Sequence, residues 1–497
     1  MRDLASYPDA HLRLFDRPPL PPPAEIEDVY LIGICGKGMG ALAELLKKAG
    51  YSVRGADEAA FPPMSTRLDA LGIRVLEGYD PAHLEPAPDL VVVGNAATPT
   101  HPEATAARER GLVQDSLPGA LGHFFLDGRR SLVVAGTHGK TTTTGMMVHV
   151  FRSAGTDPGF LIGGVMAGDE STCAVGTGPH FIIEGDEYDS AYFDKRPKML
   201  HYRPDCAIVT SMEFDHADIY EDWDDYRAAF RRFVALLPED GLLALNGDDP
   251  EVRALAEFAR CEVQFFGLEG DDDHITAEDV QRVDGGQTFW LTVGGRRLVE
   301  VFLPMSGWHN RFDALGVCAL ALREGLTPEQ IADGFASFRG MKRRQEVLGE
   351  AAGVVIVDDF AHHPTAVRAT LEATAEKWPG RRVVAVFEPR SNSSRRKVFE
   401  QTYGEAFEGA GAAFISAPIH RETDADGEEY LSADAVADRI RALGTPAQAF
   451  GDADALLPPL LDELREGDVA LVMSNGSFGG LHQKLLTALR ERDTAAA

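Results

Sequence analysis

A phosphate-binding turn stands out in the segment Gly136-Thr137-His138-Gly139-Lys140-Thr141-Thr142. The backbone amides of such a turn can cradle the phosphates of ATP at the start of a helix, where the helix dipole favours an anion. The Lys140 ammonium would bridge β- and γ-phosphate oxygens, and the Thr141 hydroxyl would ligate magnesium. Only two residues separate the glycines, so the turn is a short variant of the usual P-loop. An apolar strand before it and a helical stretch after it favour this interpretation over a glycine turn without a ligand.

Two other apolar runs end in groups that can hold a metal. FIIEGDEYDS brings Glu184, Asp186 and Glu187 to a strand end, and AIVTSMEFDHADIY brings Asp215 and His216 to another. Carboxylates and a neutral imidazole beside a P-loop are suited to hold magnesium against phosphates. Each acidic group alone is more often a solvated turn, but the P-loop upstream favours a magnesium site.

A glycine-rich turn also follows the first apolar strand, in VYLIGICGKGMGALAELL. Its glycines are spaced three, two and two apart, which does not match the G-x-G-x-x-G of dinucleotide-binding proteins. The next strand ends at Asp57, and a later apolar run leads into a polar turn that begins with Asn95. These features predict a nucleotide-binding βαβ unit, with both turns at the carboxyl edge of a parallel sheet. The ligand need not be NAD.

The elements that must position these groups form three blocks. Strand and helix patterns begin at Val29; after DGRR the strand SLVVA enters the P-loop, and strands and helices alternate to about Gly340. The third block begins near KRRQEV, with strands predicted at 354–357, 383–387, 413–415 and 469–473. The sequence therefore predicts an α/β protein of three domains, at residues 1–128, 129–341 and 342–497.

The composition argues against several classes of partner. With 48 basic and 78 acidic side chains the formal charge is −30, which repels nucleic acid and anionic membranes, although local amides can still bind a nucleotide. The five cysteines are scattered, without a C-x-x-C pair, as expected in a reducing compartment. Neither a signal peptide nor a membrane-spanning apolar run is evident, so a cytoplasmic protein is expected.

Five motifs in this order resemble those of the Mur ligases: the short P-loop, E-x-D-E after a strand, D-H-x-D, H-N before a helix, and D-x-x-H-H-P in the last third. The likeness covers essentially residues 29 to 490. It implies a Rossmann-like domain that binds a UDP-sugar, a central P-loop ATPase domain, and a C-terminal Rossmann-like domain that closes on ATP and binds a peptide. The implied enzyme is an ATP-dependent, amide-bond-forming ligase that uses Mg²⁺ and acts as a monomer or weak dimer.

The substrates are also suggested by this resemblance. GICGKGMG and DDFAHHPTA look like the branch that acts on UDP-N-acetylmuramate, while EGDEYDSAYFDKRPKMLHY, FEPRSNSSRRK and MSNGSFGGLHQKL look like its murein-recycling member. That activity joins UDP-N-acetylmuramate through an acyl phosphate to the murein tripeptide L-Ala-γ-D-Glu-meso-diaminopimelate. The alternative is the member that adds L-alanine. A nucleotide-binding scaffold without catalysis would not need phosphoryl-transfer residues from two domains, and a dehydrogenase would need hydride chemistry that nothing downstream supplies.

The resemblance assigns roles to individual residues. Magnesium would be held by Thr141, Glu184 and His216, and the catalytic residues would be Lys140, His216 and Arg344. ATP would be bound by Gly136, Thr137, His138, Gly139, Lys140, Thr141, Thr142, Asn310, Arg344 and Asp359. The UDP-sugar would be bound by Gly36, Lys37, Gly38, Met39, Asp57 and Asn95. The peptide would be bound by Arg390, Ser391 and Asn392.

Three positions depart from the family pattern. Phe230 stands where several Mur ligases have a carbamoylated, magnesium-bridging lysine, so no carbamate can form there. The H-N motif ends in Asp313 where many relatives have a second asparagine, which could alter the contacts to the base. Lys37 lies inside the first glycine-rich turn, where it could face the UDP pyrophosphate or point to solvent.

Overall fold

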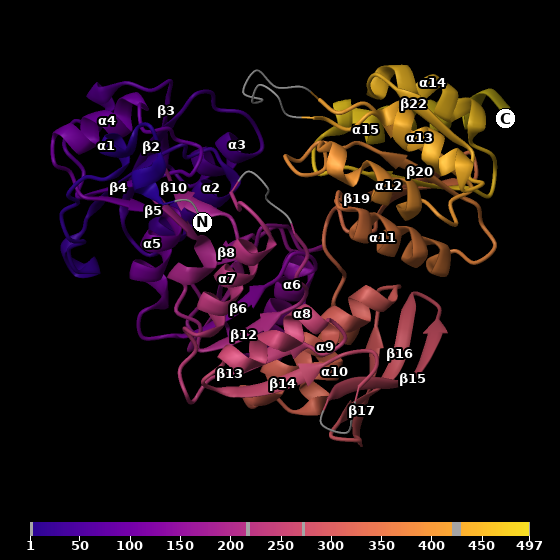
Figure 1. Cartoon of the computed structure of the whole chain (residues 1–497), viewed down its shortest axis with the longest axis horizontal. Coiled ribbons are helices and arrows are strands. Elements are labelled where there is room, and N and C mark those ends of the chain that lie inside the picture. The colour runs from indigo at the N-terminus through magenta and orange to yellow at the C-terminus, as the bar shows by residue number, and fades with distance from the viewer. Residues whose placement is uncertain (1–2, 215–218, 271–273, 420–428, 497) are drawn as a thin grey trace. The chain divides into compact units, whose positions relative to one another are not determined.

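The computed structural model describes residues 3–214, 219–270, 274–419 and 429–496 (Figure 1). The chain forms two compact units. Unit 1 comprises Met1–Glu278, Trp290–Glu300 and Asp313–Phe338. Unit 2 comprises Asp279–Phe289, Val301–Phe312 and Arg339–Ala497. In the described part of the chain, no helix is both long enough and apolar enough to cross a membrane.

The first sheet of unit 1 is a five-stranded parallel sheet with the order β3-β2-β1-β4-β5. Its strands are β1 Asp28–Ile32, β2 Ser52–Asp57, β3 Arg74–Glu77, β4 Leu90–Val93 and β5 Gln114–Ser116. The accompanying helices are α2 Lys37–Lys48, α3 Met64–Ala70, α4 Pro102–Glu109 and α5 Leu117–Leu121. The strand order reverses between β1 and β4, so the turns after these two strands flank the position where open α/β sheets bind ligands.

The second sheet has ten strands in the order β17-β16-β15-β14-β13-β12-β6-β9-β7-β8. The strands near the P-loop are β6 Arg130–Ala135, β7 Gly159–Leu161, β8 Cys173–Ala174, β9 His180–Gly185, β12 Cys206–Val209, β13 Leu242–Asn246 and β14 Glu262–Phe266. The main helices are α6 Lys140–Ser153, α7 Trp223–Val234, α9 Trp308–Arg323 and α10 Pro328–Ser337. A small hairpin, β10 Asp189–Ala191 and β11 Asp194–Pro197, follows β9.

The regular alternation of strands and helices predicted up to Gly340 is wrong for one segment. Strands β15 Ile275–Val283, β16 Gly286–Val293 and β17 Arg296–Leu303 follow each other without a helix. Only two residues separate each strand from the next, which is a hairpin connection rather than a crossover. Many side chains of β15 and β17 are exposed or half-buried, which explains why the segment lacks the continuous apolar runs of the parallel strands.

Unit 2 contains a six-stranded sheet with the order β18-β19-β23-β20-β21-β22. The strands are β18 Glu346–Ala351, β19 Val354–Asp359, β20 Val383–Phe387, β21 Ala412–Ser416, β22 Ala447–Phe450 and β23 Val469–Met473. The helices are α11 Pro364–Lys377, α12 Glu400–Ala406, α13 Ala433–Ala442, α14 Ala453–Glu463 and α15 Leu481–Ala496. Only β18 runs antiparallel to its neighbour, and two hydrophobic clusters pack against the sheet. The α/β class predicted from the sequence is confirmed.

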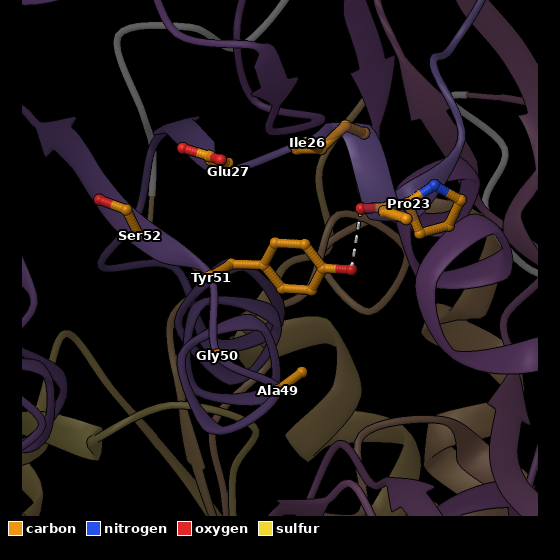
Figure 2. Close-up of a pocket in the computed structure, with 8 residues that line it drawn as sticks. Pro23, Ile26, Glu27, Ala49, Gly50, Tyr51 and Ser52 are labelled. Carbon is orange, nitrogen blue, oxygen red and sulfur yellow. Dashed lines mark hydrogen bonds between the residues drawn. The ribbon is translucent and has the colours of Figure 1, made fainter.

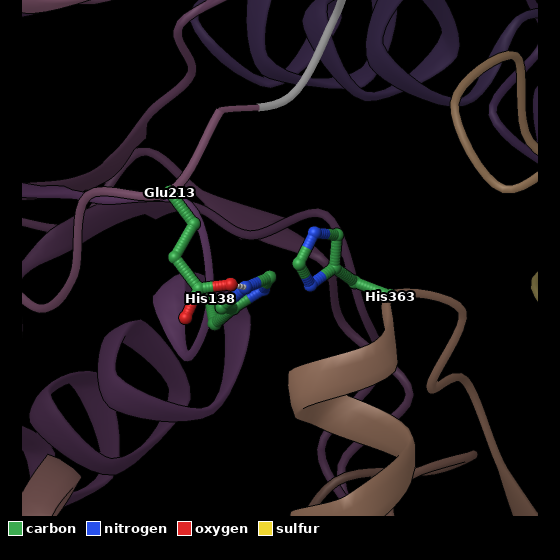
Figure 3. A group of neighbouring side chains, drawn as sticks. All are labelled: His138, Glu213 and His363. Atoms are coloured by element: carbon green, nitrogen blue, oxygen red, sulfur yellow. Dashed lines mark hydrogen bonds and ion pairs between the residues drawn. The ribbon is translucent and has the colours of Figure 1, made fainter. Parts of the chain in front are cut away.

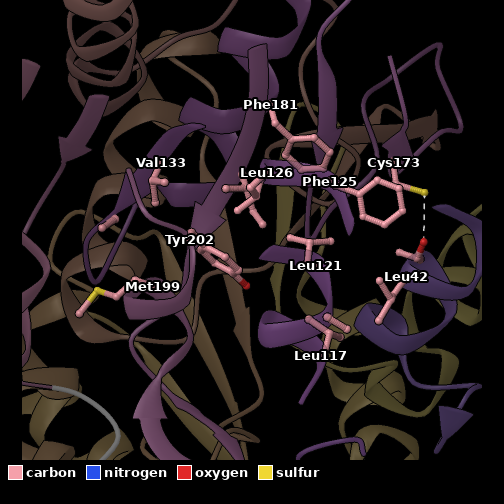
Figure 4. Packing of buried hydrophobic residues seen from close by; sticks show 14 of the residues in the cluster. Leu42, Leu117, Leu121, Phe125, Leu126, Val133, Cys173, Phe181, Met199 and Tyr202 are labelled. Atoms are coloured by element: carbon pink, nitrogen blue, oxygen red, sulfur yellow. Dashed lines mark hydrogen bonds between the residues drawn. The ribbon is translucent and has the colours of Figure 1, made fainter. Parts of the chain in front are cut away.

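The first two α/β layers of unit 1 share one hydrophobic core. Leu42 of α2 belongs to the same cluster of buried residues as Val133 of β6 and Phe181 of β9 (Figure 4). At the same place the Cys173 thiol of β8 donates a weak hydrogen bond to the Ala41 carbonyl oxygen, at 3.5 Å. This contact stabilises the packing of the two sheets, because the apolar surface of each is removed from water.

Candidate active site

The P-loop connects the carboxyl end of β6 to the amino end of α6. Gly139 adopts φ 80° immediately before the helix, and a Cβ atom there would lie 2.6 Å from Asp313 Oδ1. Gly136 has φ 136° and would carry a Cβ into the Thr210 hydroxyl. Thr210 Oγ1 donates to the His138 carbonyl oxygen at 2.5 Å. Both glycines are therefore required by the turn, which is held against the end of β12.

Lys140 makes three hydrogen bonds, two of them within this turn. Its Nζ donates to Gly136 O at 2.5 Å, to Thr137 O at 3.3 Å and to Glu187 Oε2 at 2.8 Å. Burial opposes the charged form, but Glu187 and the neighbouring carboxylates raise the pKa of Lys140 above its usual value. The residue is thus a cation held beside the helix N-terminus, as phosphate binding requires.

Glu184, Asp186 and Glu187 form what we call the acid group. Thr141 Oγ1 donates to Glu184 Oε2 at 3.0 Å, and the Gly163 amide donates to Glu184 Oε1 at 2.6 Å. Burial, together with the charge of Asp186, raises the pKa of Glu184 to about 7. The negative charges of these neighbouring carboxylates repel one another. A divalent cation that prefers oxygen ligands would balance them. The Thr141 hydroxyl and the Glu184 carboxylate therefore fit a magnesium ion.

Part of the predicted metal site cannot be placed. His216 and Asp215 lie outside the described residues, so the metal and catalytic roles of His216 stay predictions. Within the P-loop, His138 Nε2 lies 3.2 Å from Glu213 Oε2 (Figure 3). The Glu213 amide in turn donates to Thr137 Oγ1 at 2.9 Å, which ties the turn to the segment after β12.

Phe230, the first departure from the family pattern, is a core residue of α7. It is fully buried, and its ring centroid lies 5.2 Å from that of Tyr226. The Tyr226 hydroxyl lies 2.8 Å from Thr137 Oγ1 in the P-loop. The helix therefore supports the turn through a contact between these two aromatic rings, and Phe230 brings no metal ligand.

Two contributors to this site did not appear among the predicted site residues. The acidic motif suggests Glu187 only as one of several carboxylates that could hold magnesium, whereas in the structure its carboxylate pairs with Lys140 and is only 1% exposed. Lys198 lies in the short 3-10 helix Lys198–His201, with Nζ 3.9 Å from Asp186 Oδ2. The sequence signal for Lys198 is a lysine set among apolar residues, in KMLHY.

The first-domain residues assigned to the UDP-sugar gather at the carboxyl edge of its sheet. Lys37 begins α2, and Asn95 is exposed in the turn after β4. The Asp57 carboxylate accepts hydrogen bonds from the Cys35 amide at 2.8 Å and the Glu58 amide at 2.9 Å. Asp57 therefore shapes the turn itself, and its contact with uridine stays a prediction. The remaining assigned residues, Gly36, Gly38 and Met39, lie at the start of α2.

A hollow in unit 1 lies at the opposite edge of the same sheet. It measures about 480 Å³ and is lined by residues 23–24, 26–27 and 49–52 (Figure 2). Tyr51 crosses it, with its hydroxyl 3.4 Å from the Pro23 carbonyl oxygen. Because the hollow adjoins the amino ends of β1 and β2, it is not where an open parallel sheet binds nucleotides.

In unit 2, the residues assigned to ATP form hydrogen bonds with their sequence neighbours and with Gln345. The Gln345 amide donates to Asp359 Oδ2 at 2.8 Å, and its side-chain Nε2 lies 3.1 Å from His309 Nε2. Burial and the charge of Arg344 lower the pKa of His309 to about 4, so the ring is neutral. Asn310 Nδ2 donates to the Ser306 carbonyl oxygen at 2.7 Å.

The residues assigned to the peptide follow β20. Arg390 Nη1 lies 4.0 Å from Glu388 Oε1, and the Ser474 hydroxyl, which follows β23, donates to Glu388 Oε2 at 2.5 Å. Ser391 Oγ accepts a hydrogen bond from the Ser394 amide at 2.9 Å. These residues share the carboxyl edge of neighbouring strands with Asn392, so one ligand could reach them together.

Three family models match the chain: the Mur ligase family catalytic domain at residues 28–129, the Mur ligase middle domain at 134–321, and the Mur ligase glutamate ligase domain at 343–476. The UDP-N-acetylmuramate–L-alanyl-gamma-D-glutamyl-meso-2,6-diaminoheptandioate ligase of Escherichia coli (strain K12) is 38% identical over 469 residues, 94% of this chain and 99% of that protein.

Two other relatives are similar over most of their length. The UDP-N-acetylmuramate–L-alanine ligase of Kineococcus radiotolerans is 38% identical over 480 residues, 94% of this chain and 98% of that protein. The crystal structure of a murein peptide ligase from Psychrobacter arcticus 273-4 has a TM-score of 0.70 and 33% identity, covering 93% of this chain and 99% of that one. With all three domains matched, the chain belongs to the Mur ligase family.

Proposed function

We propose that this protein is the ATP-dependent ligase that joins UDP-N-acetylmuramate to the tripeptide L-Ala-γ-D-Glu-meso-diaminopimelate in peptidoglycan recycling. The observation that carries the proposal is the P-loop with Lys140 paired to Glu187 and Thr141 paired to Glu184. This arrangement combines a phosphate cradle with a metal site, which a phosphoryl-transfer enzyme needs. The name of the Escherichia coli relative specifies this tripeptide, and the Psychrobacter arcticus relative is a murein peptide ligase, so both support a peptide as the nucleophile.

The proposed reaction has two steps. An oxygen of the muramate carboxylate attacks the γ-phosphorus of ATP, the bond to the β–γ bridging oxygen breaks, and ADP leaves. The peptide amine then attacks the acyl carbon, and phosphate leaves as the amide forms and the amine loses its proton. Lys140 binds the phosphate oxygens throughout, and magnesium, when bound at Thr141 and Glu184, neutralises charge on the phosphates.

The other site residues and the domain boundaries are proposed as the sequence predicts them. We propose domain boundaries near residues 128 and 341, ATP contacts by Asn310, Arg344 and Asp359, and a magnesium ligand in His216. The reaction consumes ATP and a UDP-sugar, which favours the cytoplasm. A monomer or weak dimer remains the expected assembly.

The peptide pocket distinguishes the tripeptide from L-alanine as nucleophile. A tripeptide with several carboxylates needs cations, whereas alanine needs a tight cavity. Of the basic residues in FEPRSNSSRRK, Arg395 is buried and donates to the Ile419 carbonyl oxygen at 2.8 Å, and Lys397 pairs with Glu429 at 3.0 Å. We assign the contact with a peptide carboxylate to Arg390, whose side chain is 35% exposed and which follows β20 at the carboxyl edge of the sheet.

The test compares nucleophiles by ADP release with UDP-N-acetylmuramate as acceptor. We expect kcat/KM for the tripeptide to exceed that for L-alanine by at least about a hundredfold, roughly 2.7 kcal/mol. Arg390→Met should reduce this preference, while Lys397→Met, a change at an exposed cation of the same segment, should leave it. Equal turnover with free L-alanine would overturn the tripeptide assignment and leave the L-alanine-adding activity.

A further inference from the structure

Lys198 is held against the segment that follows β9. Its backbone amide donates to the Tyr188 carbonyl oxygen at 3.0 Å, and the Met199 amide donates to the Asp186 carbonyl oxygen at 3.0 Å. These bonds fix the 3-10 helix Lys198–His201 beside the acid group. The Lys198 side chain is only 10% exposed. The lysine is thus part of the site and not of the solvated surface.

The Lys198 ammonium is buried but has few polar partners. Nζ lies 4.0 Å from the centroid of the Tyr188 ring and 3.9 Å from Asp186 Oδ2. It makes no hydrogen bond to any residue within the described ranges, although an ammonium carries three N–H donors. Burial lowers the pKa of Lys198, while the surrounding carboxylates favour its charged form. A buried cation with unused donors suits an anionic ligand.

The other lysines nearby differ from Lys198 in this respect. Lys140 uses its donors on two carbonyl oxygens of the P-loop and on Glu187. Lys195 of β11 is paired with Asp189 of the same hairpin. Lys140 lies in the P-loop, where it can bind phosphate. We therefore look for a different anion as the ligand of the Lys198 ammonium.

The charge of the acid group indicates which anion this is. A substrate carboxylate that approaches Glu184, Asp186 and Glu187 is repelled by them unless a cation accompanies it. We propose that Lys198 binds the carboxylate of the acyl substrate and holds it for attack on the phosphate. This inference rests on the proposed function, and it makes Lys198 the residue by which the site recognises a carboxylate-bearing sugar.

The test uses two nucleotide sugars that differ in that carboxylate. UDP-N-acetylmuramate carries a lactyl carboxylate, and UDP-N-acetylglucosamine lacks the lactyl group. Calorimetry without ATP would measure both affinities for the wild type, Lys198→Met and the matched control Lys195→Met. We expect the wild type and Lys195→Met to prefer UDP-N-acetylmuramate by about tenfold or more, the size of a charge-assisted hydrogen bond. Lys198→Met should lose that preference while its affinity for UDP-N-acetylglucosamine is unchanged.

The outcomes separate the two proposals. A Lys198→Met protein that keeps the wild-type preference would overturn the role of Lys198 and leave the proposed function intact. A wild type that binds neither sugar nucleotide would overturn the proposed function itself. If Lys198→Met lost both affinities, the residue would be structural, and the inference would fail.

Discussion

Two buried carboxylate sites of unit 1, Glu324 and the acid group, differ in how their negative charge is balanced. Glu324, directly after α9, accepts hydrogen bonds from Arg130 Nη2 at 2.7 Å and Arg130 Nε at 2.8 Å, and it lies 2.9 Å from His180 Nε2. Although burial opposes it, these partners lower the pKa of Glu324 to about 2. In the acid group, by contrast, burial and a neighbouring carboxylate raise the pKa of Glu184 to about 7.

The difference separates a structural group from a functional one. The charge of Glu324 is balanced inside the protein, so the group needs no ligand. The acid group is balanced only in part by Lys140 and Lys198, and a cation from outside would complete it. A raised pKa of a buried carboxyl group beside a P-loop, as at Glu184, is expected of a site that binds metal and substrate.

The largest effect is expected from Lys140→Ala. The substitution removes the cation that faces the phosphates, and with it roughly 3 kcal/mol or more of transition-state stabilisation, so turnover should be abolished in an ADP-release assay. Binding of UDP-N-acetylmuramate, measured by calorimetry, should survive because that ligand is assigned to the first domain. Loss of both would show that the two nucleotide sites are not separate.

The next largest effect is expected from Glu184→Gln. An amide in place of this carboxylate removes a magnesium ligand, so the Mg²⁺ concentration for half-maximal activity should rise about tenfold or more. The free protein should not lose thermal stability, since a buried carboxylate beside Asp186 is costly when charged. A large drop in the melting temperature near pH 8 would mean that Glu184 is a structural group like Glu324.

Glu324→Gln should show the opposite pattern. Without the carboxylate, the half-buried Arg130 and the buried His180 lose a charged hydrogen-bond acceptor, which should lower the free energy of unfolding by about 2 kcal/mol. Turnover at 25 °C should change little, because the group makes no contact with the P-loop residues described above. Urea unfolding and kinetics on the same preparation would check both statements.

The pH dependence gives this prediction a second readout. Because the folded-state pKa of Glu324 is depressed, its contribution is present above the unfolded value near 4.5 and is lost as the pH falls toward 2. The difference in unfolding free energy between wild type and Glu324→Gln should therefore shrink below pH 4.5. A difference that stays constant down to pH 3 would mean that the charge of Glu324 is not what stabilises the fold.

The smallest effect is expected from bicarbonate. Phe230 occupies the place of the lysine that forms a carbamate in several relatives, so adding or removing bicarbonate should leave turnover unchanged. Lys198 should also remain an ammonium, as its position over the Tyr188 ring favours a cation. Activity that depends on bicarbonate, or a carbamoylated lysine peptide found by mass spectrometry, would contradict this.

Local patterns predicted those parts of the fold that depend on neighbours in the sequence. Strands β20 and β23 were expected at the residues where they are found, because five consecutive apolar residues can be buried on both faces of a parallel sheet. The P-loop was expected from its glycines and the strand before it. The polar β15–β17 segment gave no such signal, and a helix was wrongly expected between its strands.

The balance of charge in the site was not accessible from the sequence. Glu324 and Arg130 are 194 residues apart in the chain, and the fold brings the residue after α9 to the first residue of β6. Lys198 reaches Asp186 because the β10–β11 hairpin returns the chain to the end of β9. A sequence pattern shows that these side chains are charged, but not which charges meet.

The core shared by the first two domains limits how members of this family can be recombined. A chimera whose junction falls between β5 and β6 would replace one side of the packing around Leu42, Val133 and Phe181 and keep the other. Mismatched volumes there would leave cavities or clashes, although neither nucleotide site had been altered. Exchanges of sugar specificity are therefore expected to succeed when the donor supplies the first two domains together.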